Sequence, residues 1–290
     1  MATNLHTNTA AATTLKALSI IAAISFLAVV AINGMANALP LNGVNTGQLS
    51  DEIPNLFVPA GLTFSIWGLI YLLLVGYSAA IVREGFRAGK ASAWTTRDAG
   101  LFIINMAANV GWIFAWHWRL VGIAMVLMLV ILGTLIALEQ LNQAKLASGG
   151  ALDASLGAAV TTTRSRAFFL TVPLRVYLGW ISVATIANVT ALLVSLGWGG
   201  FGISERFWTV LVIAAGLAVA LGFSVWKRQV AAPLVVVWAY AGIVLKRFQE
   251  SAQGEPLEVL VASAAGVAAA IILVSFAYGR IACPFRPKKA

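Results

Sequence analysis

Tryptophan, tyrosine and asparagine side chains recur at helical spacing in three apolar segments of the chain. Residues three, four or seven positions apart lie on one face of a helix, so each segment presents one stripe of aromatic and amide groups. An indole ring can stack on a flat ligand, and an amide can both donate and accept hydrogen bonds. Such stripes either join neighbouring helices or line a mostly apolar ligand pocket, and spacing alone leaves both interpretations open. The stripes are Phe64, Trp67 and Tyr71; Asn105, Asn109, Trp112 and Trp116; and Trp180, Ala184 and Asn188.

Few other side chains could carry chemistry. A single cysteine, Cys283, excludes an internal disulfide, and only two histidines, His6 and His117, could ligate a metal or haem iron. Asp98 and Glu139 fall near helix ends, and no carboxylate falls at mid-span, which disfavours a proton- or sodium-coupled transporter built on a buried acid. We therefore expect no catalytic residue, no metal site and no required cofactor.

The composition indicates where these segments lie. Hydrophobic residues make up 60% of the 290 residues and charged residues only 10%, with a mean hydropathy of +0.91. A soluble domain carries roughly 25% charged residues, so most of this chain is expected in hydrocarbon. The net charge of +9 is then interpreted as membrane-orienting charge, and no nucleic-acid partner is expected.

Hydropathy predicts an all-α integral membrane protein with about eight transmembrane helices. Fifteen of the 19 lysines and arginines fall on one side, which predicts a multi-pass protein of the cell (inner) membrane with both termini cytoplasmic. The four cations on the outer side are Arg119, Arg206, Lys246 and Arg247. The predicted spans are 17–37, 60–82, 99–117, 121–141, 169–197, 207–226, 230–246 and 259–279.

Two further features concern the segments around the first spans. Residues 17–31 could form the core of a signal peptide with a cleavage site near Ala36–Ala38, but the stretch is long enough to span, and we expect a retained helix. The outer loop 38–59 is long and carries no cation. Long loops often form lids, so this loop is a candidate lid that covers a binding site.

The stripe residues carry a resemblance to a known family. Three motifs in the expected order resemble those of the TspO/MBR family, the tryptophan-rich sensory proteins or translocator proteins. The resemblance covers about residues 17–197, so the chain resembles a long variant with extra C-terminal helices. The motifs are Pro59 with Phe64, Trp67 and Tyr71; Asn109 with Trp112; and Trp180 with Ala184, Thr185 and Asn188.

The resemblance implies a membrane receptor, sensor or carrier with a ligand pocket inside a five-helix bundle. The implied ligands are porphyrins, haem and sterol-like molecules. The family's sterol-associated pattern after the fifth helix is absent, since Leu193–Trp198 has no following basic residue, so a planar tetrapyrrole is the better expectation. The expected ligand-binding residues are Phe64, Trp67, Tyr71, Asn109, Trp112, Trp180, Ala184 and Asn188.

The domain organisation follows from the resemblance. We expect a cytoplasmic tail over 1–16, a five-helix bundle over 17–197, three additional helices over 198–280 and a basic cytoplasmic tail over 281–290. On the eighth span Ala262, Gly266 and Ala270 recur every four residues, a close-approach pattern for packing on the bundle or in a homodimer. The expected partners are thus a small hydrophobic ligand, the lipid bilayer and a possible second copy.

Two other function classes remain open at this point. The alternative is a multi-helix secondary transporter of a small apolar solute, for which Pro233 within the seventh span would supply a kink. A membrane enzyme is disfavoured by the missing catalytic groups, although breakdown of a bound porphyrin would need only tryptophans and oxygen.

Overall fold

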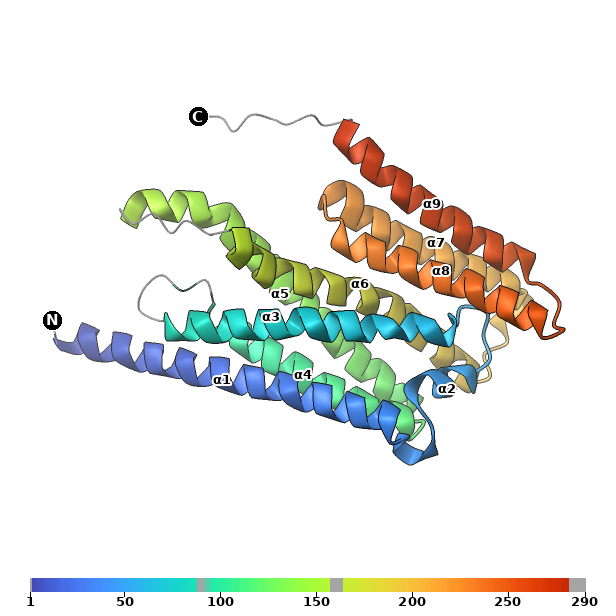
Figure 1. Ribbon diagram of the computed structural model, residues 1–290, viewed down its shortest axis with the longest axis horizontal. Coiled ribbons are helices and arrows are strands. Elements are labelled where there is room, and N and C mark those ends of the chain that lie inside the picture. The colour runs from blue at the N-terminus through green and yellow to red at the C-terminus, as the bar shows by residue number, and fades with distance from the viewer. Residues whose placement is uncertain (1, 88–91, 93, 157–163, 282–290) are drawn as a thin grey trace. The chain divides into compact units, whose positions relative to one another are not determined.

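The computed structural model describes residues 2–87, 92, 94–156 and 164–281. Within these ranges the regular structure is entirely helical (Figure 1). Cys283 lies outside the described residues. The elements are α1 (Ala2–Ala38), η1 (Leu41–Gly43), α2 (Thr46–Asp51), η2 (Gly61–Ser65), α3 (Ile66–Phe86), α4 (Thr96–His117), α5 (Val121–Leu156), α6 (Arg164–Ser195), η3 (Gly200–Gly202), α7 (Glu205–Leu221), η4 (Gly222–Trp226), α8 (Ala231–Ala252) and α9 (Val259–Ile281).

Eight of the described helices are long and apolar enough to cross a membrane, so the predicted all-α membrane fold is confirmed. The apolar stretches are Ala10–Ala38, Gly61–Phe86, Thr96–His117, Val121–Lys145, Ala167–Ser195, Glu205–Trp226, Ala231–Ala252 and Val259–Phe276.

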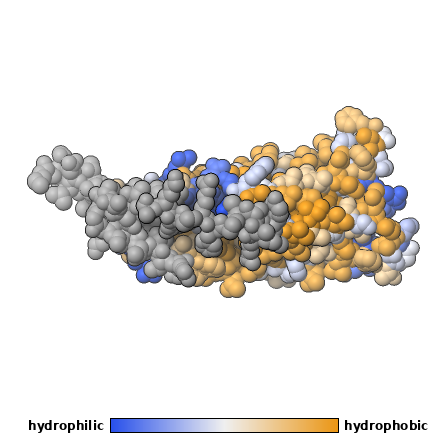
Figure 2. Space-filling model, turned by 90° about the horizontal axis from the view of Figure 1, so that it is seen from above, coloured by the Kyte–Doolittle hydropathy of each residue, from blue (hydrophilic) through white to orange (hydrophobic). Residues whose placement is uncertain are grey.

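The surface of these helices is apolar. Large hydrophobic side chains such as Leu72, Val126 and Val274 are more than half exposed. In the view of Figure 2, hydrophobic residues cover most of the coloured surface. Such a surface is unfavourable in water and suits contact with lipid chains.

The chain divides into two compact units, each described here by itself. Unit 1 comprises Met1–Thr46 and Trp67–Leu178, and unit 2 comprises Gly47–Ile66 and Gly179–Ala290. The outer loop and α6 therefore each contribute to both units. The predicted boundary between the five-helix bundle and the additional helices, after residue 197, rests on the family resemblance and stays a prediction.

In unit 1, α4 packs against α1 and α5. Its first turn is closed by a capping box, in which Thr95 accepts a hydrogen bond from the backbone of Asp98 and donates its own backbone N–H to the Asp98 carboxylate. This arrangement satisfies two amide groups that a helix start would leave unpaired. Phe102 of α4 then packs edge-on against Trp94 and at a tilt against Tyr77, and all three are fully buried.

The charged groups at the predicted inner end of unit 1 pair with one another. Lys145 contacts the fully buried Asp98 at 2.5 Å, and Arg175 donates to the buried Glu139 at 3.0 Å. These pairs join α4 to α5 and α5 to α6. Removing one partner of such a pair would leave an uncompensated buried charge.

In unit 2, α9 packs against α7 and α8 through small and branched residues. The buried face of α9 carries Ala265, Ala268 and Ile272, whereas a Cβ at Gly266 would meet nothing within 4 Å. Of the predicted Ala262–Gly266–Ala270 face, Ala262 is buried, whereas Gly266 and Ala270 are exposed within unit 2. Packing of this face on the bundle or in a homodimer stays a prediction.

The expected kink at Pro233 is wrong. The helix α8 begins at Ala231, so Pro233 lies in its first turn. The backbone N–H groups of a first turn have no partner within the helix, so a proline there removes no hydrogen bond and does not bend the axis. Pro233 therefore gives no support to a transporter.

Candidate functional site

Three aromatic rings form a compact cluster in unit 1. Trp67 and Tyr71, one helical turn apart on α3, stack with ring centroids 5.4 Å apart. Tyr177 of α6 meets the Trp67 ring edge-on at 5.8 Å. Trp67 and Tyr71 are only partly buried, whereas Tyr177 is buried. The cluster thus offers aromatic faces anchored by a buried phenol.

A chain of hydrogen bonds holds this cluster to two other helices. Asn109 of α4 donates from Nδ2 to the Tyr177 hydroxyl at 2.6 Å, and its Oδ1 accepts from Asn33 of α1 at 3.2 Å. All three residues are buried. Both the donor and the acceptor of the Asn109 amide thus have partners on other helices, so Asn109 positions Tyr177.

The remaining α4 stripe residues also have defined partners in unit 1. Asn105 donates to Ile131 O and to the Thr134 hydroxyl of α5, at 3.0 and 2.7 Å. Trp112 stacks on Trp116, with centroids 5.6 Å apart and planes 14° from parallel. Asn105 and Asn109 thus both bind groups on other helices.

Unit 2 contains the other half of the predicted residues. Phe64 of η2 meets the buried Trp180 of α6 edge-on, with centroids 5.8 Å apart. One helical turn separates Trp180 from Ala184, and the next turn brings Asn188, which donates to Ala184 O at 2.9 Å. These residues lie along one face of α6, as their spacing predicted.

The predicted site residues therefore form two groups. Trp67, Tyr71, Asn109 and Trp112 belong to unit 1, and Phe64, Trp180, Ala184 and Asn188 belong to unit 2. Within each unit the structure brings aromatic members into contact. A single pocket that joins the two groups stays a prediction.

Sequence reasoning missed Tyr177, which belongs to the unit 1 cluster, and Asn33, which binds Asn109. Tyr177 lies three residues before Trp180 on the same apolar helix, so the helical spacing that selected Trp180 also selects Tyr177. Asn33 is an amide inside the first predicted span, and such a group needs a partner on another helix. The same rules that selected Asn109 could therefore have selected both residues.

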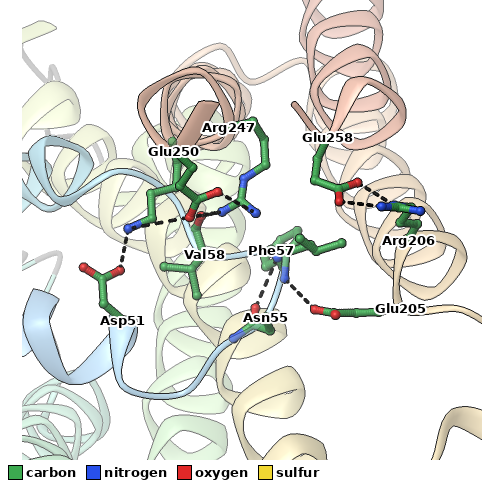
Figure 3. Close-up of polar contacts among 11 residues, drawn as sticks. Asp51, Asn55, Phe57, Val58, Glu205, Arg206, Arg247, Glu250 and Glu258 are labelled. Carbon is green, nitrogen blue, oxygen red and sulfur yellow. Dashed lines mark hydrogen bonds and ion pairs between the residues drawn. The ribbon is translucent and has the colours of Figure 1, made fainter. Parts of the chain in front are cut away.

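The loop expected to act as a lid is held by unit 2 from Gly47 onward. The residues directly after the loop bind α8, since Ala60 N–H donates to Gly242 O and the Trp238 indole donates to Thr63 O, both at 2.9 Å. Side chains and backbone of the loop itself reach charged residues of α7 and α8, drawn in Figure 3. Lys246 contacts Asp51 at 2.9 Å, and Leu56 N–H donates to Glu205 at 3.0 Å.

The described residues bring no group of three His, Cys, Asp or Glu side chains together to hold a metal ion. The buried His117 donates from Nδ1 to Ile113 O at 2.8 Å, one turn back on α4. The aromatic, amide and apolar side chains described above can stack on a ligand, form hydrogen bonds with it and make apolar contacts. Such groups suit ligand binding.

Comparison with known proteins adds the family. A family model described as TSPO-like protein matches residues 19–278. The matched range includes all eight apolar helices, and thus extends beyond the resemblance over 17–197 seen in the motifs. No curated protein and no solved structure gives a significant match.

Proposed function

Because the chain belongs to the TSPO-like protein family, we propose that it is a membrane receptor or carrier for a hydrophobic planar ligand of the tetrapyrrole type. The coarser part of this function, a membrane binding protein, follows from the family. The ligand class rests on the aromatic clusters.

The observation that carries the proposal is the Trp67–Tyr71–Tyr177 cluster. Tyr177 is held by a buried hydrogen bond from Asn109, and Trp67 packs against both Tyr177 and Tyr71, so these rings are oriented before any ligand arrives. A preorganised aromatic surface loses little conformational entropy on binding and favours a rigid, flat ligand. In unit 2, the buried Trp180 with the small Ala184 one turn later offers a second such surface.

The roles of the residues follow from their contacts. Trp67 and Trp180 supply aromatic faces for stacking. Asn109 and Asn33 act as positioning residues, because the Asn109 amide binds Tyr177 and the Asn33 amide binds Asn109. None of the expected ligand-binding residues is a histidine or cysteine, and His117 lies at the end of α4, so the metal-free porphyrin should bind about as tightly as haem.

The test is a titration of the purified protein with protoporphyrin IX, read by porphyrin absorbance and by quenching of tryptophan fluorescence. Truncating one stacked aromatic costs roughly 1–3 kcal/mol, by analogy with rings that stack on flat bases. Trp67→Ala and Trp180→Ala should each weaken binding about ten- to hundredfold.

The matched control is Trp226→Ala, because Trp226 is 86% exposed and belongs to neither cluster. Its affinity should equal that of the parent protein. Equal losses at Trp226 and Trp180, or no porphyrin binding by the parent, would remove the tetrapyrrole proposal.

A further inference from the structure

A polar pocket of about 330 Å³ lies in unit 2, between the segment around residues 50–58, the first turn of α7 and the last turns of α8. This is the side that the charge distribution predicts to be outside. The pocket is separate in chemistry from the aromatic clusters, since charged side chains make up much of its wall (Figure 3). Its carboxylates are Asp51, Glu205, Glu250, Glu255 and Glu258.

Three of these carboxylates form ion pairs with lysine or arginine side chains. Lys246 contacts Asp51 at 2.9 Å, the Arg247 guanidinium contacts Glu250 at 3.2 Å, and Arg206 contacts Glu258 at 2.6 Å.

Glu205 and Glu255 form no ion pair with any residue that the structure describes. The pocket wall therefore carries an excess of negative charge. That excess favours a cationic ligand.

An unsatisfied donor adds a second requirement. Arg247 lines the pocket and is only 3% exposed. Its two terminal nitrogens contact Glu250, and one of them also reaches Val58 O. Its Nε–H finds no acceptor among the described residues. A buried N–H without an acceptor costs free energy, which an oxygen atom of a ligand would recover.

The residues that line the pocket also favour one kind of cation over another. Quaternary ammonium groups are recognised by aromatic cages, and none of the described residues that line this pocket is aromatic. Carboxylates instead accept short, charge-assisted hydrogen bonds from N–H donors. The lining thus favours a primary ammonium.

We propose that this pocket binds a small organic cation with a primary ammonium group and a hydrogen-bond acceptor oxygen. The ammonium group donates to Glu205 and Glu255, and the oxygen accepts from Arg247 Nε. Such a group can come from a free amine in the outer aqueous phase or from the headgroup of an aminophospholipid.

Ethanolamine and choline form the matched probe pair, because they differ only in methylation of the nitrogen. Calorimetric titration of the full-length protein in phosphatidylcholine nanodiscs should show ethanolamine binding at least about tenfold tighter than choline. Glu205→Gln and Glu255→Gln should each weaken ethanolamine binding several-fold. Glu205→Gln keeps an acceptor for Leu56 N–H, so the loop contact survives.

The control is Glu52→Gln, a neutralised carboxylate of the same loop that does not line the pocket. Its ethanolamine affinity should match that of the parent. Arg247→Lys removes the Nε–H and should also weaken ethanolamine binding, provided that its thermal unfolding shows a folded protein.

A second arm identifies the source of the ligand. If the ligand is a lipid headgroup, nanodiscs containing phosphatidylethanolamine should raise the unfolding temperature above that in phosphatidylcholine, and the Glu205→Gln/Glu255→Gln double variant should lose this gain. If it is a free amine, ethanolamine alone should raise the unfolding temperature in phosphatidylcholine.

Equal affinities for ethanolamine and choline, or an unchanged ethanolamine affinity in the double variant, would overturn the proposal, as would the absence of both effects on the unfolding temperature. Porphyrin binding is read separately, so either proposal can fail without the other.

Discussion

The amide of Asn109 donates a 2.6 Å hydrogen bond to the hydroxyl of Tyr177, and thereby ties α4 to α6 inside the apolar part of unit 1. Tyr177 in turn meets the Trp67 ring edge-on, so one buried hydrogen bond fixes the orientation of the aromatic cluster. The amide stripe of α4 therefore joins helices, and the aromatic stripe of α3 gains a fixed neighbour. The helix-joining interpretation thus applies to the α4 amides, whereas a ligand-binding role for the aromatic stripe stays a proposal.

The first prediction concerns this bond. Asn109→Ala should lower stability, because the Tyr177 hydroxyl loses its buried donor and the Asn33 amide keeps only Val29 O as an acceptor, whereas Tyr177→Phe should cost less. A double-mutant cycle from unfolding in detergent should give a coupling of about 0.6–1.7 kcal/mol, the range for hydrogen bonds between membrane helices. Strict additivity of the two changes would show that the bond contributes nothing.

The second prediction concerns the close approach of η2 to α8. A Cβ at Gly242 would overlap the Thr63 hydroxyl and lie 2.8 Å from its Cγ2 atom. Gly242→Ala should therefore destabilise unit 2 by about 1–3 kcal/mol, as overpacking does. Thermal unfolding measures the loss, and adding Thr63→Ala should recover part of it. Gly266→Ala is the control, because a Cβ there meets nothing within 4 Å and, inside a helix, should not lower the unfolding temperature.

The third prediction concerns pH. Arg206 donates two hydrogen bonds to Glu258, at 2.6 and 2.8 Å, and holds the pKa of that carboxyl below its ordinary value of 4.5. A carboxyl whose pKa is lower in the folded than in the unfolded protein stabilises the fold above the unfolded pKa, and loses this contribution as the pH falls through the folded pKa. Between about pH 5 and about pH 3, the unfolding temperature should therefore fall more steeply in the parent than in Glu258→Gln.

The effect should be small and should shrink in high salt, because the Arg206 side chain is exposed. Glu255→Gln, which removes a carboxylate without an ion pair among the described residues, should keep the slope of the parent. An identical slope in Glu258→Gln would show that the ion pair does not contribute to folding.

The fourth prediction concerns the topology, which the charge distribution predicts. In a Cys283→Ser background, a cysteine at Asn45 should react with a membrane-impermeant reagent in whole cells. A cysteine at the exposed Lys227 should react only after the cells are opened. The reverse pattern would show that both termini lie outside.

Much of the fold could be predicted from the sequence, because its signals are local. Each span is a run of apolar residues, and the backbone of a lipid-exposed segment must satisfy its own hydrogen bonds, so hydropathy alone located eight helices. The motifs around Trp67, Asn109 and Trp180 lie within single helices as well, and they were enough to identify the family.

Helical spacing also predicted which residues of one helix share a face. It correctly grouped Trp67 with Tyr71 and placed Trp180, Ala184 and Asn188 along one line of α6. It failed at Pro233, because a shift of a helix start by one or two residues turns an interior proline into one of the first turn.

Only the tertiary structure decided which groups meet. The partners of Asn109 come from α1 and α6, 76 and 68 residues away along the chain, and no local pattern specifies how those helices are rotated. Likewise, η2 can approach α8 because Gly242 has no side chain where Thr63 lies, and Arg247 is left with an unpaired Nε–H because Glu250 and Val58 engage only its terminal nitrogens. Hydropathy and periodicity are properties of one segment, whereas hydrogen-bond partners depend on the packing of several, and that packing is set by side-chain shapes that the sequence does not place in space.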